Sequence, residues 1–134
     1  MNLQDLSLHF SDFNLEGYSF DCQLIAGEVD VLQVMIEGFE EVPIYISTTD
    51  TQILCIAYLW SESEVAKDTR TEMLEAMLDM NIPMPLSSFS RIQDQYAVFG
   101  ALATNSRLED IAHEVITLGE NAVEVLSMMS GFLK

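Results

Sequence analysis

The chain has 134 residues, of which 49% are hydrophobic, and its 22 acidic and 5 basic side chains give a net charge of -17. This length suits one domain with a single core, and so much regularly placed apolar sequence argues against intrinsic disorder. Five basic side chains are too few to neutralise a nucleic-acid backbone, so we expect no binding to nucleic acid.

The start of the chain resembles neither an export signal nor a membrane anchor. It has no basic segment and no apolar stretch, and no apolar run elsewhere approaches the ~18 residues of a membrane-spanning helix. Cys22 and Cys55 fit no CxxC pattern and lie among alternating apolar residues. This favours buried, reduced thiols over a disulfide. We therefore expect a cytoplasmic protein without membrane insertion.

The first half of the chain predicts a short helix followed by a sheet. Leu3, Leu6 and Phe10 recur at the spacing of one helical face. From residue 18 onward the apolar period changes to two, which is typical of half-buried strands. Turn residues separate four expected strands, over 18–24, 29–37, 42–47 and 52–60.

The strand expected over 52–60 is apolar on both faces. Simple alternation places one set of side chains on each face: Ile53, Cys55, Ala57 and Leu59 on one, and Leu54, Ile56, Tyr58 and Trp60 on the other. Both faces of such a strand should be covered. Helices of the same chain can cover one face, but a domain this small has few elements left for the other, so a partner subunit or a ligand is a natural candidate.

A second helix is expected after a polar loop over 61–67. Thr69 and Glu72 have the three-residue offset of a capping box, which predicts the start of this helix. Asn81, followed by Pro83 and Pro85, predicts its end.

A hairpin and a long helix complete the chain. Strands expected over 89–93 and 96–102 flank the pair Asp94–Gln95, a two-residue gap suited to a hairpin. Ser106 and Glu109 repeat the capping-box offset, and an apolar face then continues for about six helical turns.

The element order is therefore α-β-β-β-β-α-β-β-α, with short connections between strands. We predict a single two-layer α+β domain over residues 1–134, with a mainly antiparallel sheet and its helices on one face.

Charge is distributed very unevenly along the sequence. Residues 1–66 contain twelve carboxylates and no Lys or Arg. A surface of one sign repels nucleic acid and anionic lipid and attracts basic partners. Solubility alone also explains an acidic surface, so recruitment of basic partners and simple solubility both stay open.

Methionines are the second unusual feature, since Met73, Met77, Met80 and Met84 follow one another through the middle helix and its exit. Such residues fill cores, and where exposed they adapt to varied partner segments. Phe39 and Trp60, each at a turn or strand end, are further candidates for exposure. Our candidate partner-binding residues are Leu54, Ile56, Tyr58, Trp60, Met73, Met77 and Phe39.

Catalytic chemistry has little support in the sequence. No P-loop, GxGxxG, G-x-S-x-G or calcium-loop pattern occurs. His9, Asp110 and His113 leave open a metal-dependent or small-molecule enzyme with a site near the last helix, although a solvated helix face explains these residues better. We assign no catalytic, cofactor-binding or metal-binding residue.

Over nearly its whole length the chain resembles the bacterial YjfI-like family. The resemblance rests on the opening Met1-Asn2-Leu3, on Cys55-Ile56-Ala57, and on the Met80-Asn81-Ile82-Pro83-Met84-Pro85 segment. It implies a small cytoplasmic protein, often encoded beside a PspA-like coiled-coil protein, with no assigned activity.

Size, acidity and element order are also similar to class I type III secretion chaperones and YbjN-like domains. This second resemblance implies a dimeric α+β protein that binds extended or amphipathic segments of partners.

These observations together predict a non-enzymatic, chaperone- or adaptor-like protein-binding module that forms a homodimer. Its protein partner is expected to be basic or amphipathic, and a PspA-like coiled-coil protein is one candidate. The alternatives are the enzyme described above and a subunit that is stable only within a complex.

Overall fold

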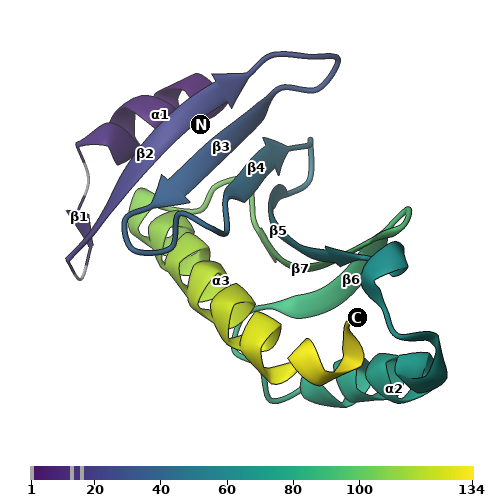
Figure 1. Cartoon of the computed structure of the whole chain (residues 1–134). Helices are drawn as coiled ribbons and strands as arrows, with labels where there is room; N and C mark the ends of the chain where they lie inside the picture. The colour runs from purple at the N-terminus through teal and green to yellow at the C-terminus, as the bar shows by residue number, and fades with distance from the viewer. Residues whose placement is uncertain (1, 13, 16) are drawn as a thin grey trace.

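An antiparallel sheet with helices on one face forms the architecture of the molecule (Figure 1). The computed structural model describes residues 2–12, 14, 15 and 17–134. Its elements, in chain order, are α1 (Leu3–Ser11), β1 (Asn14–Leu15), β2 (Tyr18–Ile25), β3 (Val31–Ile36), β4 (Ile44–Thr48), β5 (Ile53–Ser61), α2 (Arg70–Met80), β6 (Ser88–Ile92), β7 (Gln95–Leu102) and α3 (Leu108–Met128). Short 3-10 turns span Glu62–Glu64, Lys67–Thr69 and Ser130–Phe132.

The strands lie side by side in the order β1-β2-β3-β4-β5-β7-β6, and every neighbouring pair is antiparallel. The predicted two-layer α+β class and the predicted order of elements are confirmed. The two-residue strand β1, which the sequence pattern did not predict, extends the sheet beside β2.

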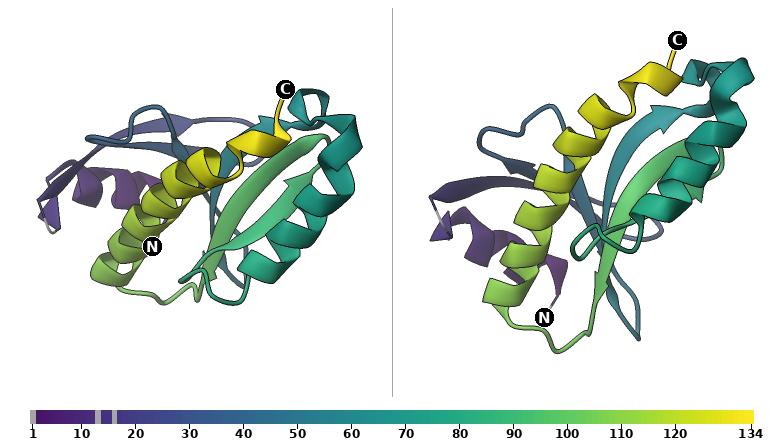
Figure 2. Two further views of the ribbon diagram at one scale, coloured as in Figure 1. Left: turned by 60° about the horizontal axis from the view of Figure 1, so that its bottom comes forward. Right: turned by 90° about the horizontal axis from the view of Figure 1, so that it is seen from below.

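The helices share one face of the sheet, which we call the inner face (Figures 1 and 2). Leu6 and Phe10 of α1 and Ile111, Val115 and Leu118 of α3 are buried there in one continuous core. The matching strand positions are buried too: Leu32, Val34, Ile36, Ile44, Ile46, Ile53 and Cys55. Burial of each large apolar side chain contributes roughly 1.5–3 kcal/mol, so this layer supplies most of the stabilisation.

Helices α2 and α3 begin differently from the sequence prediction. The Thr69 side chain makes no capping hydrogen bond, and the Ser106 hydroxyl donates to the Ala103 carbonyl instead, so both predicted capping boxes are wrong. A capping box does form earlier, where Glu64 accepts from the backbone N–H of Ser61 at 3.1 Å. The three-residue offset alone does not distinguish these cases.

The hairpin between β6 and β7 turns at Gln93 and Asp94, one residue before the predicted pair. Gln93 takes the left-handed conformation, with φ of 56°, and Gln95 already pairs with Ile92 in the ladder. A non-glycine residue at this φ is uncommon, so the sequence pattern gives little indication of the turn's position.

The two cysteines are free, as the sequence predicts. Cys55 is fully buried in β5, where burial, and secondarily Glu114, raise the pKa of its thiol to about 12. Cys22 is half-buried in β2, and burial, with Asp21, raises its pKa to about 11. Both thiols are therefore poor nucleophiles at neutral pH.

No helix within the described part of the chain is long and apolar enough to span a membrane.

Candidate protein-interaction surface

The face of the sheet opposite the helices, which we call the outer face, is largely apolar. Residues that are paired directly across the ladders point to the same side, so the register identifies its members. Ile56 of β5 lies between Tyr45 of β4 and Phe99 of β7, and Tyr58 lies opposite Ala97. At the far end of the sheet Ile25 lies opposite Val31.

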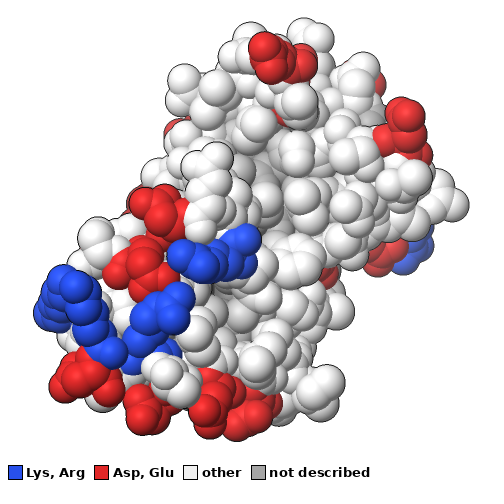
Figure 3. Space-filling model, turned by 90° about the vertical axis from the view of Figure 1, so that its right-hand side faces the viewer, with Lys and Arg blue, Asp and Glu red and all other residues white. Residues whose placement is uncertain are grey.

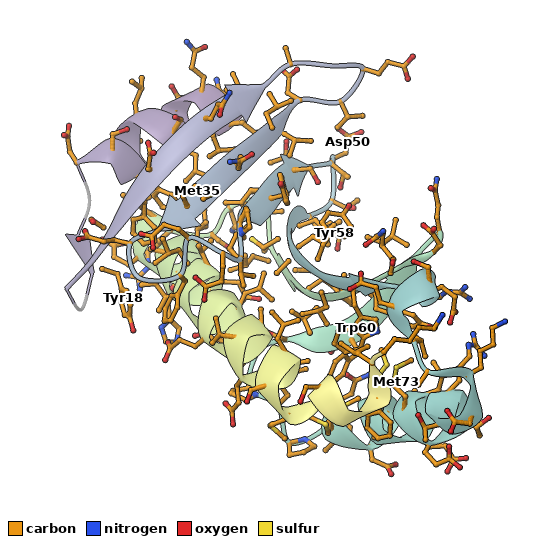
Figure 4. The ribbon with its side chains drawn as sticks, viewed as in Figure 1. Tyr18, Met35, Asp50, Tyr58, Trp60 and Met73 are labelled. Atoms are coloured by element: carbon orange, nitrogen blue, oxygen red, sulfur yellow. The ribbon has the colours of Figure 1, made fainter. Side chains whose placement is uncertain are left out.

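A shallow hollow of about 320 Å³ extends across β2, β3, β4 and β5 on this outer face. Its lining residues are Ile25, Val31, Tyr45, Ser47, Ile56 and Tyr58. The rings of Tyr45 and Tyr58 meet edge to face, with centroids 5.8 Å apart. Tyr58 keeps 43% of its surface exposed, and Figure 4 shows it on the side of the sheet away from α3. Apolar side chains are therefore left facing water here.

The outer face is also almost uncharged. Within the described strands, the outward positions of β3, β4, β5, β6 and β7 carry no charged side chain, and Asp21 supplies the one carboxylate on β2. A chain with a net charge of -17 thus keeps most of one sheet face free of charge. Exposed apolar areas of this kind typically mark interaction sites.

Three of the seven predicted partner-binding residues, Leu54, Ile56 and Tyr58, lie together on the outer face. The prediction that Trp60 joins them is wrong. The register shifts between Tyr58 and Trp60, because the one extra residue on β5 is Leu59. This irregularity reverses the alternation, so Trp60 points to the inner face and is buried beside Tyr96 (Figure 4).

Of the remaining candidates, two adopt the core alternative that the sequence left open, and the third is only half-buried. Met73 and Met77 of α2 are buried in the core, where they fill space beneath the sheet. Phe39 is half-buried and stacks on Tyr18, with ring centroids 5.6 Å apart. The helical spacing of the methionines is compatible both with filling the core and with lining a groove. Met73 and Met77 fill the core.

Glu62 accepts hydrogen bonds from three side chains at one end of the sheet. Arg70 donates from two nitrogens at 3.0 Å each, Arg91 donates at 3.1 Å, and the Tyr96 hydroxyl donates at 2.7 Å. The bonds from Arg70 and Tyr96 lower the pKa of Glu62 to about 2. This carboxylate therefore ties the start of α2 to the β6–β7 hairpin and stays ionised at neutral pH.

Most of the basic side chains gather around this carboxylate. Lys67, Arg70 and Lys134 line a hollow beside Glu62, and Arg91 bonds to it directly. Figure 3 shows these cations at one end of the molecule among carboxylates, next to a broad uncharged surface. Two of these cations, Arg70 and Arg91, are therefore paired with the same carboxylate.

The predicted alternative site near α3 does not form a metal centre. His9 and His113 are both exposed, and Asp110 is paired with Arg107 at 3.3 Å. In the described residues, no three His, Cys, Asp or Glu side chains are placed to hold one ion.

One buried carboxyl lies on the inner face. Glu114 of α3 packs against Gly100 of β7, where any Cβ would overlap its carboxyl group. Burial raises the pKa of Glu114, and neighbouring His113 partly offsets the effect. Sequence reasoning did not single out this residue, because its spacing on α3 resembles that of the solvated carboxylates.

Among the solved structures that share the fold are those of YbjN and of the ExsC–ExsE complex. The crystal structure of YbjN from E. coli matches with a TM-score of 0.69 and 17% identity, covering 99% of this chain and 94% of that chain. The crystal structure of the ExsC–ExsE complex matches with a TM-score of 0.53 and 10% identity, covering 96% and 97%. The predicted resemblance to YbjN-like domains is therefore confirmed for the fold.

No curated protein matches the sequence. The narrower YjfI-like resemblance stays a prediction. Residues 1–133 match the bacterial family described as "Uncharacterized protein conserved in bacteria (DUF2170)", and the chain belongs to that family.

Proposed function

We propose that this chain is a non-enzymatic, chaperone- or adaptor-like protein-binding module that pairs with a second copy through its outer sheet face. The observation that carries the proposal is the hollow around Tyr45, Ile56 and Tyr58, which is apolar and has no helix of the described chain over it. Covering such a surface removes apolar area from water, which stabilises association by roughly 25 cal/mol per Å² before the costs of ordering.

Charge favours a second copy over a basic partner at this face. The outward positions of β3 to β7 offer no carboxylate to pair with Lys or Arg. Two chains of charge -17 repel each other over most of their surfaces, so an uncharged face is where two copies can approach at the lowest electrostatic cost. The similarity to a chain of the ExsC–ExsE complex supports a protein-binding role.

The acidic remainder of the surface suits recruitment of basic or amphipathic partner segments, among which a PspA-like coiled-coil protein remains a candidate. Attraction of this kind weakens with salt. Binding of such a partner should therefore fall markedly between low and physiological ionic strength, and an unchanged affinity would remove electrostatic recruitment from the proposal.

Size-exclusion chromatography with light scattering tests the self-association. The wild-type chain should have twice the monomer mass at micromolar concentration, and Ile56→Glu should have the monomer mass. Leu8→Glu is the matched control, because Leu8 is 66% exposed on α1, away from the outer face. A strictly monomeric wild type, or an Ile56→Glu variant that still dimerises, would refute pairing through this face.

A further inference from the structure

A second apolar hollow, which we call the exit groove, lies where the chain leaves α2 and crosses α3. It measures about 250 Å³. Met80, Met84, Val125 and Met128 give it an apolar lining, and Pro83 and Glu124 stand at its margin. Its lining residues belong to α2, α3 and the loop after α2, and Figure 2 shows that both helices lie on the face of the sheet opposite the outer face.

The wall of the exit groove is held in place by hydrogen bonds. Asn121 of α3 donates from Nδ2 to the Pro85 carbonyl at 2.8 Å and to the Ser87 hydroxyl at 3.0 Å. At the other end of the loop, the Asn81 side chain accepts from the Phe89 N–H at 2.7 Å. The groove is thus formed before any partner arrives, which reduces the ordering cost of binding.

Exposed apolar side chains occur on the helices and on the loop next to this groove. Ile82 is 92% exposed and Leu78 is 70% exposed, and Leu86 and Met128 are also largely exposed. The groove itself is lined by three methionines, whose unbranched side chains adapt to different partner shapes. This pattern is typical of sites that receive the apolar face of an amphipathic helix.

The charges around the exit groove have one sign. Residues 71–90 and 108–133 contain no Lys or Arg. Glu124 of α3 lines the groove, and two further exposed carboxylates, Asp79 and Glu120, are the sequence neighbours of its lining residues Met80 and Asn121. A partner segment that reaches the groove therefore meets an acidic border, unlike the uncharged outer face.

We infer that the exit groove binds a basic amphipathic helix of a partner protein. Its apolar side chains would contact Met84 and Met128, and its Lys and Arg side chains would pair with Glu120, Glu124 and Asp79. The acidic border disfavours a second copy and an anionic lipid surface in the same place. The volume is below the ~300–1,000 Å³ of small-molecule sites, which favours a few partner side chains.

This inference deepens the proposed protein-binding function, on which it rests, but it does not depend on self-association. The probe is a fluorescein-labelled helical peptide of Leu and Lys, about five turns long, with its leucines on one face. Anisotropy of the peptide is titrated with the full chain at low salt. A charge-reversed Leu and Glu peptide and a scrambled Leu and Lys peptide are the comparison ligands.

We expect the Leu and Lys peptide to bind and both comparison peptides to bind at least about tenfold more weakly. Met84→Gln together with Met128→Gln should weaken binding by about tenfold. Glu120→Gln together with Glu124→Gln should weaken it severalfold and reduce its dependence on salt. Leu8→Gln and Glu28→Gln, at exposed positions elsewhere, should bind as the wild type does.

The same titration separates failure of the groove from failure of the proposed function. If all variants bind the Leu and Lys peptide with the same affinity, or if the scrambled peptide binds as tightly as the helical one, the exit groove is not the binding site. A third result is that Ile56→Glu abolishes peptide binding while the groove variants still bind. It would place the partner site on the outer face and would leave the proposed protein-binding function intact. If no peptide binds at all, the proposal that the exit groove binds a basic helix is wrong. The light-scattering measurement of the wild type and Ile56→Glu would still test self-association.

Discussion

Trp60 of β5 lies opposite Tyr96 of β7 on the helix side of the sheet, with ring centroids 5.9 Å apart. Both side chains are buried, although simple alternation from Tyr58 would place Trp60 on the outer face. The extra residue Leu59 changes the direction of the strand's last side chains. Because of this one extra residue, Tyr58 is exposed on the outer face whereas Trp60, two residues later, is buried on the inner face.

Truncation of these two residues should have very different effects on stability. Trp60→Ala should lower the free energy of unfolding by about 3–5 kcal/mol, because it leaves a large cavity in the core. Tyr58→Ala should lower the free energy of unfolding of the monomer much less, because the Tyr58 ring is only partly buried. Urea unfolding followed by circular dichroism measures both values. Equal losses for the two variants would contradict the assignment of opposite faces.

The contacts of Glu62 predict a pH dependence. Its pKa in the folded chain, about 2, lies below the ordinary value of 4.5, so its stabilising effect is complete above pH 4.5 and is lost as the pH falls through about 2. Glu62→Gln should therefore lower the urea midpoint at pH 7, and the difference from wild type should shrink between pH 4.5 and 2. Glu28→Gln, in an exposed turn, is the control. A difference that persists unchanged at pH 2 would contradict this role.

Gly100 provides a test of the packing between β7 and α3. An alanine Cβ there would overlap Glu114 Oε1 and lie 3.1 Å from the Leu86 carbonyl oxygen. Gly100→Ala should therefore cost about 1–3 kcal/mol through overpacking. Part of that loss should be recovered in the double variant with Glu114→Ala, which removes the overlapping carboxyl. Purely additive unfolding energies would show that the two residues do not meet.

Asn81 protects the exposed edge of β6. Its side chain accepts from the Phe89 N–H, a backbone donor that would otherwise be available to another strand. Asn81→Ala should accelerate hydrogen exchange at the Phe89 amide and increase light scattering on heating, because unpaired edges promote association. Asn105→Ala, in the exposed loop before α3, is the control. Unchanged exchange at Phe89 would contradict the proposed protection.

The periodicities of the sequence predicted the fold well, since alternation and helical spacing directly reflect which side chains are buried. They located α1, β2 to β7 and α3 and the apolar positions Leu54, Ile56 and Tyr58. They placed Trp60 on the wrong face, because the sequence pattern does not reveal a bulge. They also predicted capping boxes at Thr69 and Ser106 that do not form, because a cap depends on the backbone conformation as well as on residue spacing. The sequence left open whether the methionines fill the core or form a groove, since Met80 and Met84 of the exit groove share their spacing with the buried Met73 and Met77.

The most direct test of pairing through the outer face uses the fluorescence of a single indole placed there. Trp60 is the only tryptophan, so Tyr58→Trp combined with Trp60→Phe moves the reporter from the core to the outer face. If a second copy covers this face, the emission should be that of a buried indole at high concentration. It should shift to longer wavelength on dilution, together with the loss of dimer mass. Emission of an exposed indole at every concentration would contradict the proposal.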